Sequence, residues 1–339
     1  MKKAILYILL ILIVTLSGIA LYGYSIINTG FNIDKPISIY IDDNRDYNRL
    51  KNDIRDSAKV ENIANFDKLC TILSYKENIK TGRYIIKPEM TIYEVIKDLR
   101  SGHQAPIKLK FNNIRTKVDL ADRVGQQMMF DSKDLLVLLN DSVACKELGF
   151  STQDIPAMFI PNTYEIYWDI SIKNFIQRMK KEYTVFWNEE RKNKAKEINL
   201  TPIEVSTLAS IVEEECTYSD EYPIVAGLYI NRLNRGQALQ ADPTVKFAVG
   251  DFGLKRILNK HLEVDSPYNT YQHTGLPPGP IRIPSIKGID AVLNYAKHDY
   301  LYMCAKDDFS GYHEFAKTFS EHQRNAVRYR QALDKRGIR

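Results

Sequence analysis

The chain has 339 residues, of which 44% are hydrophobic, and a net charge of +5. This length leaves room for two domains with their own cores besides any membrane anchor. The basic residues are scattered except in the C-terminal run RNAVRYRQALDKRGIR, which we interpret as the exposed face of a last helix, so we expect no nucleic-acid partner.

Residues 1–30 predict a membrane anchor. After Lys2 and Lys3 no charged residue occurs before Asp34, and Ala4 to Tyr24 is long enough to cross a bilayer core as a helix. The two lysines favour a cytoplasmic N-terminus, with the rest of this single-pass protein outside the cell membrane. A cleavable signal peptide is the alternative, but no small-x-small cleavage site closes the apolar run.

Residues 31–112 predict a small α+β domain. The alternation in ISIYI, from Ile37, predicts a strand. Thr91 and Glu94 can form a capping box at the start of a helix that Gly102 ends. Helices are also expected at residues 50–60 and 66–73, and a strand at 84–86. Pro, Asn and charged residues interrupt the pattern near residues 106–113, where we expect the domain boundary.

Residues 113–339 predict a larger, mainly helical α+β domain. An aromatic loop at residues 157–168 interrupts a helical region, and it is compatible either with a sugar platform or with a packed loop. Beyond it we expect helices at 222–235 and 285–297, strands at 300–304 and 312–315, and a last helix.

One helix in this domain has well-marked ends. Thr201 can be its N-cap, Pro202 suits its first position because the missing N–H costs nothing there, and Glu204 completes a capping box. The helix is expected to continue to Cys216. Its apolar side chains cover one arc of the helical projection: Val205, Leu208, Ala209, Ile211, Val212 and Cys216.

Three consecutive glutamates end this helix and face different ways. Glu215 falls inside the apolar arc, Glu213 lies near its edge and Glu214 points to the opposite side. Burial disfavours a charged carboxylate, so the pKa of Glu215 should be raised, as a general acid requires. The alternative is a solvated acidic run in which Glu215 turns aside into a salt bridge.

Other polar residues allow two interpretations each. Asp242, directly before Pro243, is either the N-cap of a helix or a residue with a chemical or substrate-binding role. His313 has no Ser or Cys nucleophile to form a triad with, which favours a structural histidine. The stretch Tyr268–Tyr271 and the stiff turn GLPPGPI after it carry polar, aromatic and glycine residues that suit a carbohydrate.

The cysteines indicate no metal site. None of the four lies in a C-x-x-C or Cys/His spacing, so we expect no metal and no cofactor. Buried free thiols are the favoured interpretation, although an exported location would permit disulfides. The four residues are Cys70, Cys145, Cys216 and Cys304.

Six motifs occur in the order known from one family: LASIVEEEC, NRL, LQADPTV, YNTY, GLPPGPI and GYHEF followed by AKTFSEH. Together they resemble the YceG-like endolytic murein transglycosylases, over nearly the whole chain. The segment GRY to PEMTIYEVIKDLRSG is similar to the LysM-like domain of that family. The resemblance implies a cytoplasmic stub and anchor at 1–30, a LysM-like domain at 31–112 and a catalytic domain at 113–339.

The resemblance also implies an activity. Glu215 matches the family's catalytic acid, the second glutamate of an E-x-E motif. Such enzymes cut the bond between N-acetylmuramic acid (MurNAc) and N-acetylglucosamine (GlcNAc) inside a glycan strand without water, leave a 1,6-anhydroMurNAc end and limit nascent strand length. The implied partners are peptidoglycan strands, the membrane and peptidoglycan synthases. The substrate-binding residues implied are Glu213, Gln240, Asp242, Thr244, Tyr268, Asn269, Thr270, Tyr271, Gly275, Pro277, Pro278, Gly279 and His313.

The chain departs from the family pattern at three places. Cys216 follows the second glutamate where relatives commonly have threonine, Ala157 and Met158 replace Glu-Gly, and KFNNIRT replaces a segment with proline and glycine. Two other functions stay open: a two-carboxylate muramidase that uses Glu215 and Asp242 and makes reducing ends, and a non-catalytic scaffold that binds the cell wall.

Overall fold

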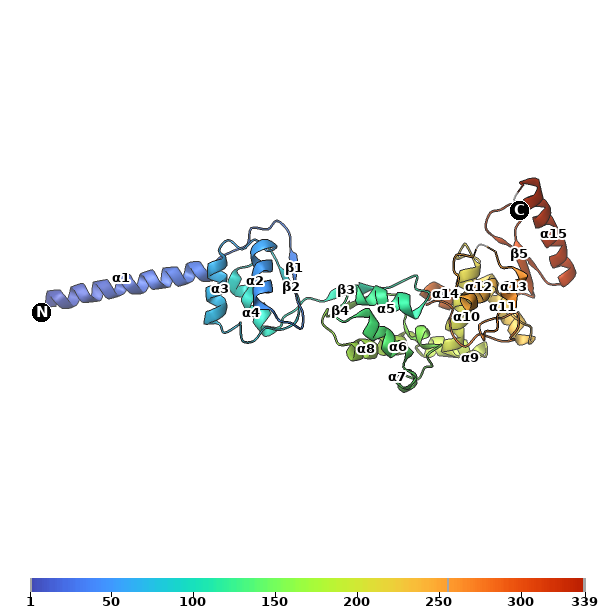
Figure 1. Ribbon diagram of the computed structural model, residues 1–339, viewed down its shortest axis with the longest axis horizontal. Coiled ribbons are helices and arrows are strands. Elements are labelled where there is room, and N and C mark those ends of the chain that lie inside the picture. Colours follow the sequence, from blue (N-terminus) through green and yellow to red (C-terminus); the bar gives the residue numbers. More distant parts are fainter. Residues whose placement is uncertain (1, 255, 338–339) are drawn as a thin grey trace. The chain divides into compact units, whose positions relative to one another are not determined.

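The structure is a computed structural model that describes residues 2–254 and 256–337. It combines helices with three two-stranded sheets within these residues (Figure 1). The chain forms two compact units. The first contains the residues up to Leu109 together with Gln127–Met129 and Tyr164–Ile170, and the second contains the rest.

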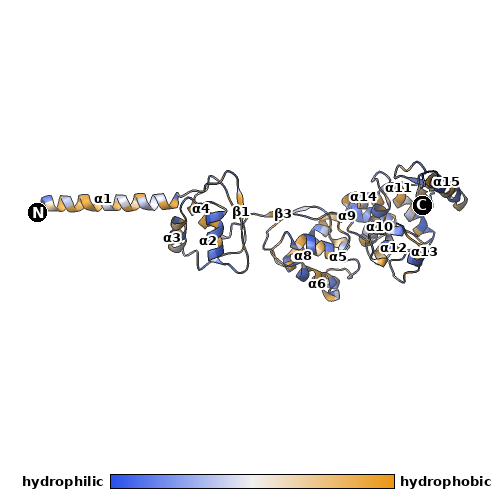
Figure 2. Cartoon of the chain, turned by 45° about the horizontal axis from the view of Figure 1, so that its top comes forward, coloured by the Kyte–Doolittle hydropathy of each residue, from blue (hydrophilic) through white to orange (hydrophobic). Residues whose placement is uncertain are grey.

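The chain begins with the long apolar helix α1 (Lys2–Ile27), which by length and composition could cross a membrane. Figure 2 shows hydrophobic residues along its length. Its last turn joins the core of the first unit, because Ile26 is only 5% exposed and Asn65 donates a hydrogen bond of 2.9 Å to the Thr29 hydroxyl. The end of α1 is thus part of a folded domain.

The first unit contains one antiparallel sheet and three short helices. Strand β1 (Ile37–Ile41) pairs with β2 (Gly82–Ile86), with Ile37 opposite Ile86. The helices are α2 (Tyr47–Asp56), α3 (Ile63–Ile72) and α4 (Ile92–Ser101). Their apolar faces and the sheet bury a core that includes Ile39, Ile54, Phe66, Ile86 and Ile96.

Several predictions for this unit are confirmed. The strand ISIYI is present, both hydrogen bonds of the Thr91–Glu94 capping box form, and Gly102 ends α4 in the left-handed region at φ 75°. Helices α2 and α3 begin before the predicted residues 50 and 66, because Asp46 and Asn62 cap them and accept hydrogen bonds from their first N–H groups.

The second unit begins with mostly helical structure. Its elements are the 3₁₀ helix η1 (Ile155–Met158) and the helices α5 (Lys117–Gly125), α6 (Ser132–Asn140), α7 (Ser142–Glu147), α8 (Ile172–Phe186) and α9 (Glu189–Glu197). The strands β3 (Ile107–Lys110) and β4 (Thr163–Ile166), which pair with each other, belong mostly to the first unit. The ring of Phe159 is 1% exposed and lies between those of Phe111 and Phe175. The packed-loop interpretation therefore holds for this aromatic residue.

The rest of the second unit is built around helix α10 (Pro202–Glu215). The elements after it are α11 (Tyr222–Asn234), α12 (Asp242–Val249), α13 (Asn259–Leu262), α14 (Ile286–Leu293), β5 (Tyr302–Ala305), β6 (His313–Ala316) and α15 (Phe319–Lys335). Helices α9, α11, α12 and α14 and η1 all contact α10. The two strands predicted near the C-terminus are confirmed, and they pair as the antiparallel β5–β6 hairpin.

Helix α10 is buried on all sides rather than along one arc. Every residue from Val205 to Glu213 is buried, including Ser206, Thr207 and Ser210. These hydroxyls donate to backbone carbonyls of the same helix, at 2.6–3.0 Å, which makes burial of the polar groups tolerable. The predicted amphipathic pattern therefore does not describe the environment of this helix.

Helix α14 is shorter than predicted. Ser285 caps it, as the sequence suggested, but it ends at Leu293 instead of residue 297. The chain leaves the helix because the Ala296 N–H donates to the Pro223 carbonyl of α11, at 2.9 Å.

Candidate active site

Helix α10 is fixed at both ends. The Thr201 hydroxyl accepts the Glu204 N–H at 3.3 Å, and the Glu204 carboxylate accepts the Thr201 N–H at 2.7 Å, so the predicted capping box is confirmed. The Cys216 N–H closes the last turn on the Val212 carbonyl, which leaves Glu215 as the final helical residue. The helix thereby holds Glu215 at a defined point.

Glu215 is partly exposed at this point and has few partners. Among the described residues its one hydrogen-bond donor is the hydroxyl of Tyr229 on α11, 2.9 Å from Oε1. Burial raises the pKa of Glu215 to about 7; the Tyr229 hydrogen bond acts against this rise, and the charge of Asp242 adds to it. The predicted direction of the pKa shift is confirmed.

A cavity of about 280 Å³ opens beside Glu215. Polar groups from α10, α11, the start of α12 and the β5–β6 hairpin line most of it. Of the predicted substrate-binding residues, four lie here with Glu215: Gln240, Asp242, Tyr271 and His313. Tyr229, Arg232 and Cys304 complete its polar wall.

Asp242 does not cap α12. It is the first residue of the helix, and no side chain caps the N-cap position at Ala241. The Asp242 carboxylate instead accepts a hydrogen bond of 2.6 Å from the Tyr271 hydroxyl. Burial, and after it this hydrogen bond, raises the pKa of Tyr271 above its usual range. The helix-capping interpretation is therefore corrected, and the carboxylate faces the cavity.

His313 is held rigidly at the edge of the same cavity. Glu221, which is 4% exposed, accepts the His313 backbone N–H at 2.9 Å and lies 3.0 Å from Nδ1 of the ring. This bidentate contact fixes the orientation of the imidazole. Its other ring nitrogen is thus positioned independently of any ligand.

A second cavity of about 970 Å³ shares Glu215 and Asp242 with the first. Helix α12, the residues before α13 and the last turns of α15 form its walls. These walls contribute Lys246, Arg256 and Arg330 as cationic side chains. Glu215 is therefore reached from two cavities of different size and charge.

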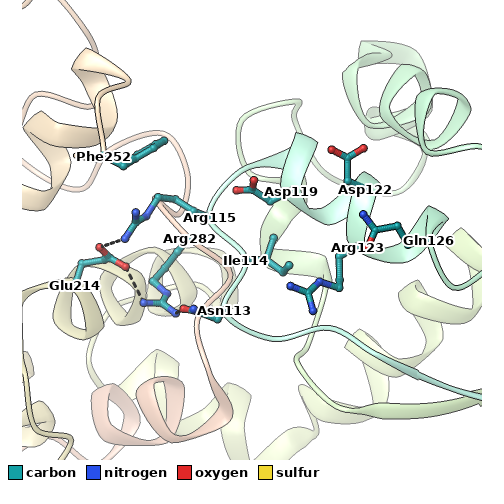
Figure 3. A pocket seen from close by; sticks show the side chains of 10 residues that line it. All are labelled: Asn113, Ile114, Arg115, Asp119, Asp122, Arg123, Gln126, Glu214, Phe252 and Arg282. Atoms are coloured by element: carbon teal, nitrogen blue, oxygen red, sulfur yellow. Dashed lines mark hydrogen bonds and ion pairs between the residues drawn. The ribbon is translucent and has the colours of Figure 1, made fainter. Parts of the chain in front are cut away.

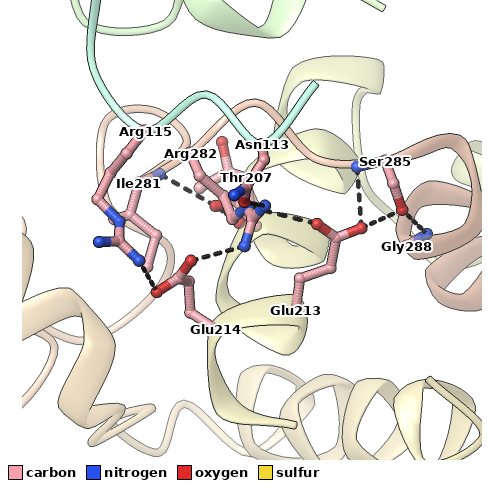
Figure 4. Close-up of polar contacts among 10 residues, drawn as sticks. Asn113, Arg115, Thr207, Glu213, Glu214, Ile281, Arg282, Ser285 and Gly288 are labelled. Carbon is pink, nitrogen blue, oxygen red and sulfur yellow. Dashed lines mark hydrogen bonds and ion pairs between the residues drawn. The ribbon is translucent and has the colours of Figure 1, made fainter. Parts of the chain in front are cut away.

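Glu213 and Glu214 are bound into a network of ion pairs and hydrogen bonds (Figure 4). Glu214 accepts from Arg115 at 2.6 Å and from Arg282 at 2.7 Å. Glu213 accepts from both the N–H and the hydroxyl of Ser285 and lies 3.5 Å from Arg282 Nε. The view that Glu214 faces away from the packed side is therefore wrong, since its side chain is 16% exposed and that of Glu213 only 4%.

A third cavity, of about 470 Å³, adjoins this network (Figure 3). Arg115 and Arg282 extend to Glu214 at its wall, and the Arg115 guanidinium lies 4.7 Å from the centre of the Phe252 ring. Arg282 also donates to the Asn113 side chain, so Asn113, Arg115, Glu214 and Arg282 hold one another in place at this wall.

Four of the predicted binding residues line none of the cavities described here: Thr244, Tyr268, Asn269 and Thr270. The Thr244 and Thr270 hydroxyls lie 2.8 Å apart, are almost fully buried and also bond the backbone of Ala241. The Asn269 amide donates to two backbone carbonyls at 2.9 Å each. Because these groups are used internally, they hold the loops that present Gln240 and Tyr271. Tyr268 packs against Phe247, with ring centroids 4.7 Å apart.

The turn GLPPGPI lies elsewhere. Gly275, Pro277 and Pro278 line a cavity of about 620 Å³ with Thr201 and Glu204, at the start of α10 rather than at its end. A Cβ at Gly279 would come within 2.3 Å of the Gln153 carbonyl oxygen, so this glycine permits close packing of the backbone instead of substrate approach.

No group of three or more His, Cys, Asp or Glu side chains in residues 2–254 and 256–337 is arranged to hold a metal ion.

Residues 39–328 match the model of the YceG-like family. The chain belongs to the YceG-like family.

Solved and curated relatives agree with this membership. The chain is 30% identical to the endolytic murein transglycosylase of Bacillus subtilis, over 74% of this chain and 73% of that protein. It is 26% identical to the endolytic murein transglycosylase of Streptococcus pneumoniae, over 96% of this chain but only 65% of that protein. A crystal structure of a YceG-like protein from Listeria monocytogenes aligns with a TM-score of 0.55 and 27% identity, covering 86% of this chain and 99% of that one.

Three residues that matter in the site of this YceG-like protein were missed from the sequence. Tyr229 lies on the buried helix α11 and has no local signal for a contact with Glu215. Arg232, in the motif NRL, is 7% exposed and donates to the carbonyls of Leu239 and Leu301, so it ties two cavity walls together. Glu221 orients His313. A buried arginine in a short motif was the one signal available.

Proposed function

We propose that this YceG-like protein is an endolytic murein transglycosylase that cleaves the MurNAc–GlcNAc bond within glycan strands and leaves 1,6-anhydroMurNAc ends. The observation that carries the proposal is the environment of Glu215, a carboxyl group at the junction of two cavities with a pKa of about 7. The names of the Bacillus and Streptococcus relatives support the general activity.

The lytic reaction needs one group that both gives and takes a proton. Protonated Glu215 delivers its proton to the glycosidic oxygen, and the bond from this oxygen to C1 of MurNAc breaks. The resulting carboxylate then removes the proton from the C6 hydroxyl, whose oxygen bonds to C1, so that Glu215 is protonated again. A pKa near neutrality suits both steps. The Tyr229 hydroxyl supports the carboxylate stage by its hydrogen bond to Oε1.

A hydrolytic muramidase is the second candidate, because Asp242 lines both cavities together with Glu215. In that reaction Asp242 would act as nucleophile or base and the product would have a reducing end. The Tyr271 hydroxyl, 2.6 Å away, would stabilise the Asp242 carboxylate. The relatives' common name, transglycosylase, favours the lytic reaction.

Mass spectrometry of digested glycan strands in ¹⁸O-labelled water separates the two reactions. We expect anhydro ends without ¹⁸O, and a loss of at least about a thousandfold in turnover for Glu215→Gln, which cannot exchange a proton. Asp242→Asn should retain anhydro products at a reduced rate. Reducing ends that carry ¹⁸O, or wild-type turnover by Glu215→Gln, would contradict the lytic proposal.

For the location, we propose that α1 is an uncleaved, single-pass anchor with the N-terminus in the cytoplasm. The burial of Ile26 and the Asn65–Thr29 hydrogen bond support retention, because cleavage near the end of α1 would remove part of a folded core. Protease added outside spheroplasts should then degrade the chain beyond residue 30, while a full-length chain that survives would contradict this topology.

The proposed domain organisation is an anchor at 1–30, a LysM-like domain at 31–112 that holds glycan, and a catalytic domain at 113–339. Binding near the membrane surface would place the catalytic domain on nascent strands and limit their length, with peptidoglycan synthases as partners. A fragment of residues 26–112, which keeps Ile26 and Thr29 of the core, should sediment with purified cell wall, and failure of the folded fragment to do so would remove glycan binding from the proposal.

A further inference from the structure

Three cationic side chains line the larger cavity and have no carboxylate partner among the described residues. They are Lys246 on α12, Arg256 before α13 and Arg330 on α15. Within the part of the chain that the structure describes, none of them lies within 4.0 Å of a carboxylate. Arg330 donates from Nε to the Ala326 carbonyl of its own helix at 3.3 Å, which leaves its two terminal NH₂ groups at the cavity.

The other arginines near the helix end are used differently. Arg115 and Arg282 both donate to Glu214, and Arg232 donates to backbone carbonyls. Arg115 and Arg282 are thus in ion pairs and Arg232 joins two cavity walls, whereas the described residues give no ion pair to the cations of the larger cavity. Four acids lie on the same walls: Glu214, Glu215, Asp242 and Asp334. The Glu214 carboxylate already accepts from Arg115 and Arg282, that of Glu215 from Tyr229 and that of Asp242 from Tyr271. Arg256 and Arg330 therefore stay available for an anionic ligand.

The two cavities beside Glu215 also differ in size. The smaller one, of about 280 Å³, has a mainly polar lining and holds Gln240 and His313. The larger one, of about 970 Å³, lies at the upper end of the roughly 300–1,000 Å³ typical of small-molecule sites. It also offers the apolar surfaces of Tyr329 and Leu333. A branched ligand with charged and apolar parts fits the larger cavity better than a single neutral sugar.

We propose that the larger cavity takes the muramyl side of the cleaved bond and that Arg256 and Arg330 bind carboxylates of its stem peptide. This inference rests on the proposed function. GlcNAc carries no ionisable group, and in a peptide-bearing strand the carboxylates belong to the peptides attached to MurNAc. These cations therefore set the direction in which a glycan strand crosses Glu215. The muramyl side of the cleaved bond lies toward α15, and the glucosamine side lies toward the β5–β6 hairpin.

The α15 part of this site lies outside the segment that matches the family. The match ends at residue 328, and the α15 residues of the cavity begin at Tyr329. The contact from Arg330 is therefore argued from this chain's own geometry. Lys246 is close enough to Glu215 to lower the pKa of that carboxyl, so it is left unchanged in the test.

The test measures binding by the full-length Glu215→Gln protein in detergent, which separates affinity from turnover. One ligand is uncross-linked glycan strands with native stem peptides, and the other is the same strands after carbodiimide coupling to ammonia has converted their carboxylates to amides. We expect about tenfold weaker binding to the amidated strands, because two exposed ion pairs are lost. Adding Arg256→Gln and Arg330→Gln should weaken binding to native strands by the same factor and abolish the sensitivity to amidation.

Arg324→Gln is the matched control. Arg324 is an exposed arginine on α15 that donates to the Ser320 hydroxyl of its own helix and does not line the cavity. Its loss should therefore change the affinity for neither the native nor the amidated strands. Equal binding to both kinds of strand, or equal losses for the double variant on both, would overturn the inference. Turnover of the wild type is measured in parallel: its absence would refute the proposed function, whereas charge-dependent binding would still support the site.

Discussion

At the end of α10, two neighbouring regions give their carboxylates opposite surroundings: one supplies cations and several hydrogen-bond donors, and the other supplies few partners. In the network region, Glu213 and Glu214 receive hydrogen bonds or ion pairs from Arg115, Arg282 and Ser285. In the cavity region, Glu215 receives one hydrogen bond from the described residues, donated by the neutral hydroxyl of Tyr229. The residues are consecutive in sequence, so the difference comes entirely from the elements packed around them.

This contrast separates a structural role from a chemical one. Carboxylates that accept from cations and N–H groups are stabilised in the charged form and hold segments together. A carboxyl with little solvation and one neutral donor keeps its proton to a higher pH, which is useful for proton transfer. The network thus ties residues 113–115 and 281–288 to the helix end and fixes the position from which Glu215 acts.

The largest expected effect comes from breaking the network region. Arg282→Met keeps much of the side-chain volume but leaves Glu213, 4% exposed, without its cation and Glu214 with only Arg115. A buried carboxylate that loses its cation and keeps only the hydrogen bonds from Ser285 should lower the free energy of unfolding by about 4 kcal/mol. Thermal unfolding of the full-length protein in detergent would measure the loss as a lower melting temperature.

A surface ion pair provides the control for this change. Arg178 pairs with Glu182 one turn along α8, and their side chains are 41% and 27% exposed. Arg178→Met should cost less than about 1 kcal/mol, because exposed pairs contribute little. If the two variants unfolded at the same temperature, the network would have no special structural role.

The sequence was most informative where the structure depends on neighbours along the chain. Capping boxes at Thr91 and Thr201 and the alternating strand at Ile37 form as predicted, since each depends on residues at most four positions apart. The starts of α2 and α3 were missed because Asp46 and Asn62 were not recognised as caps.

The site was only partly predictable, for a different reason. Helical periodicity placed Glu215 in the apolar arc, but it could not show that packing on every side would bury Glu213 more deeply than Glu215. The contacts from Tyr229 to Glu215 and from Arg282 to Glu214 join residues 14 and 68 positions apart. Such contacts depend on how the helices pack, so local sequence patterns cannot predict them.

An intermediate effect is expected from the pH dependence of stability. The pKa of Glu215 rises from 4.5 to about 7 on folding, so between these values the folded protein holds a proton that the unfolded chain has lost. Stability is therefore lost as the pH rises from about 4.5 to 7, by an amount on the order of 3 kcal/mol. Glu215→Gln cannot ionise and should not share this loss.

Comparing the two proteins isolates the contribution of this one group. Their melting temperatures should be similar at pH 4.5, and Glu215→Gln should be the more stable protein at pH 8. A difference that stays constant between these pH values would mean that Glu215 titrates normally, and the contrast with the network region would disappear.

The smallest expected effect concerns the hydrogen bond that the Tyr229 hydroxyl donates to Glu215. Tyr229→Phe removes the donor to Glu215 while keeping the ring, and this hydrogen bond favours the charged carboxylate. The pKa of Glu215 should therefore rise further. Since the protonated acid starts the reaction, the alkaline limb of kcat/KM should move to higher pH by less than about one unit, with a rate loss below about tenfold at neutral pH.

Tyr271→Phe, which removes the donor to Asp242 instead, should leave that limb in place whatever it does to the rate. A limb that moves to lower pH in Tyr229→Phe, or moves equally in both variants, would show that the Tyr229 hydroxyl does not control the proton on Glu215.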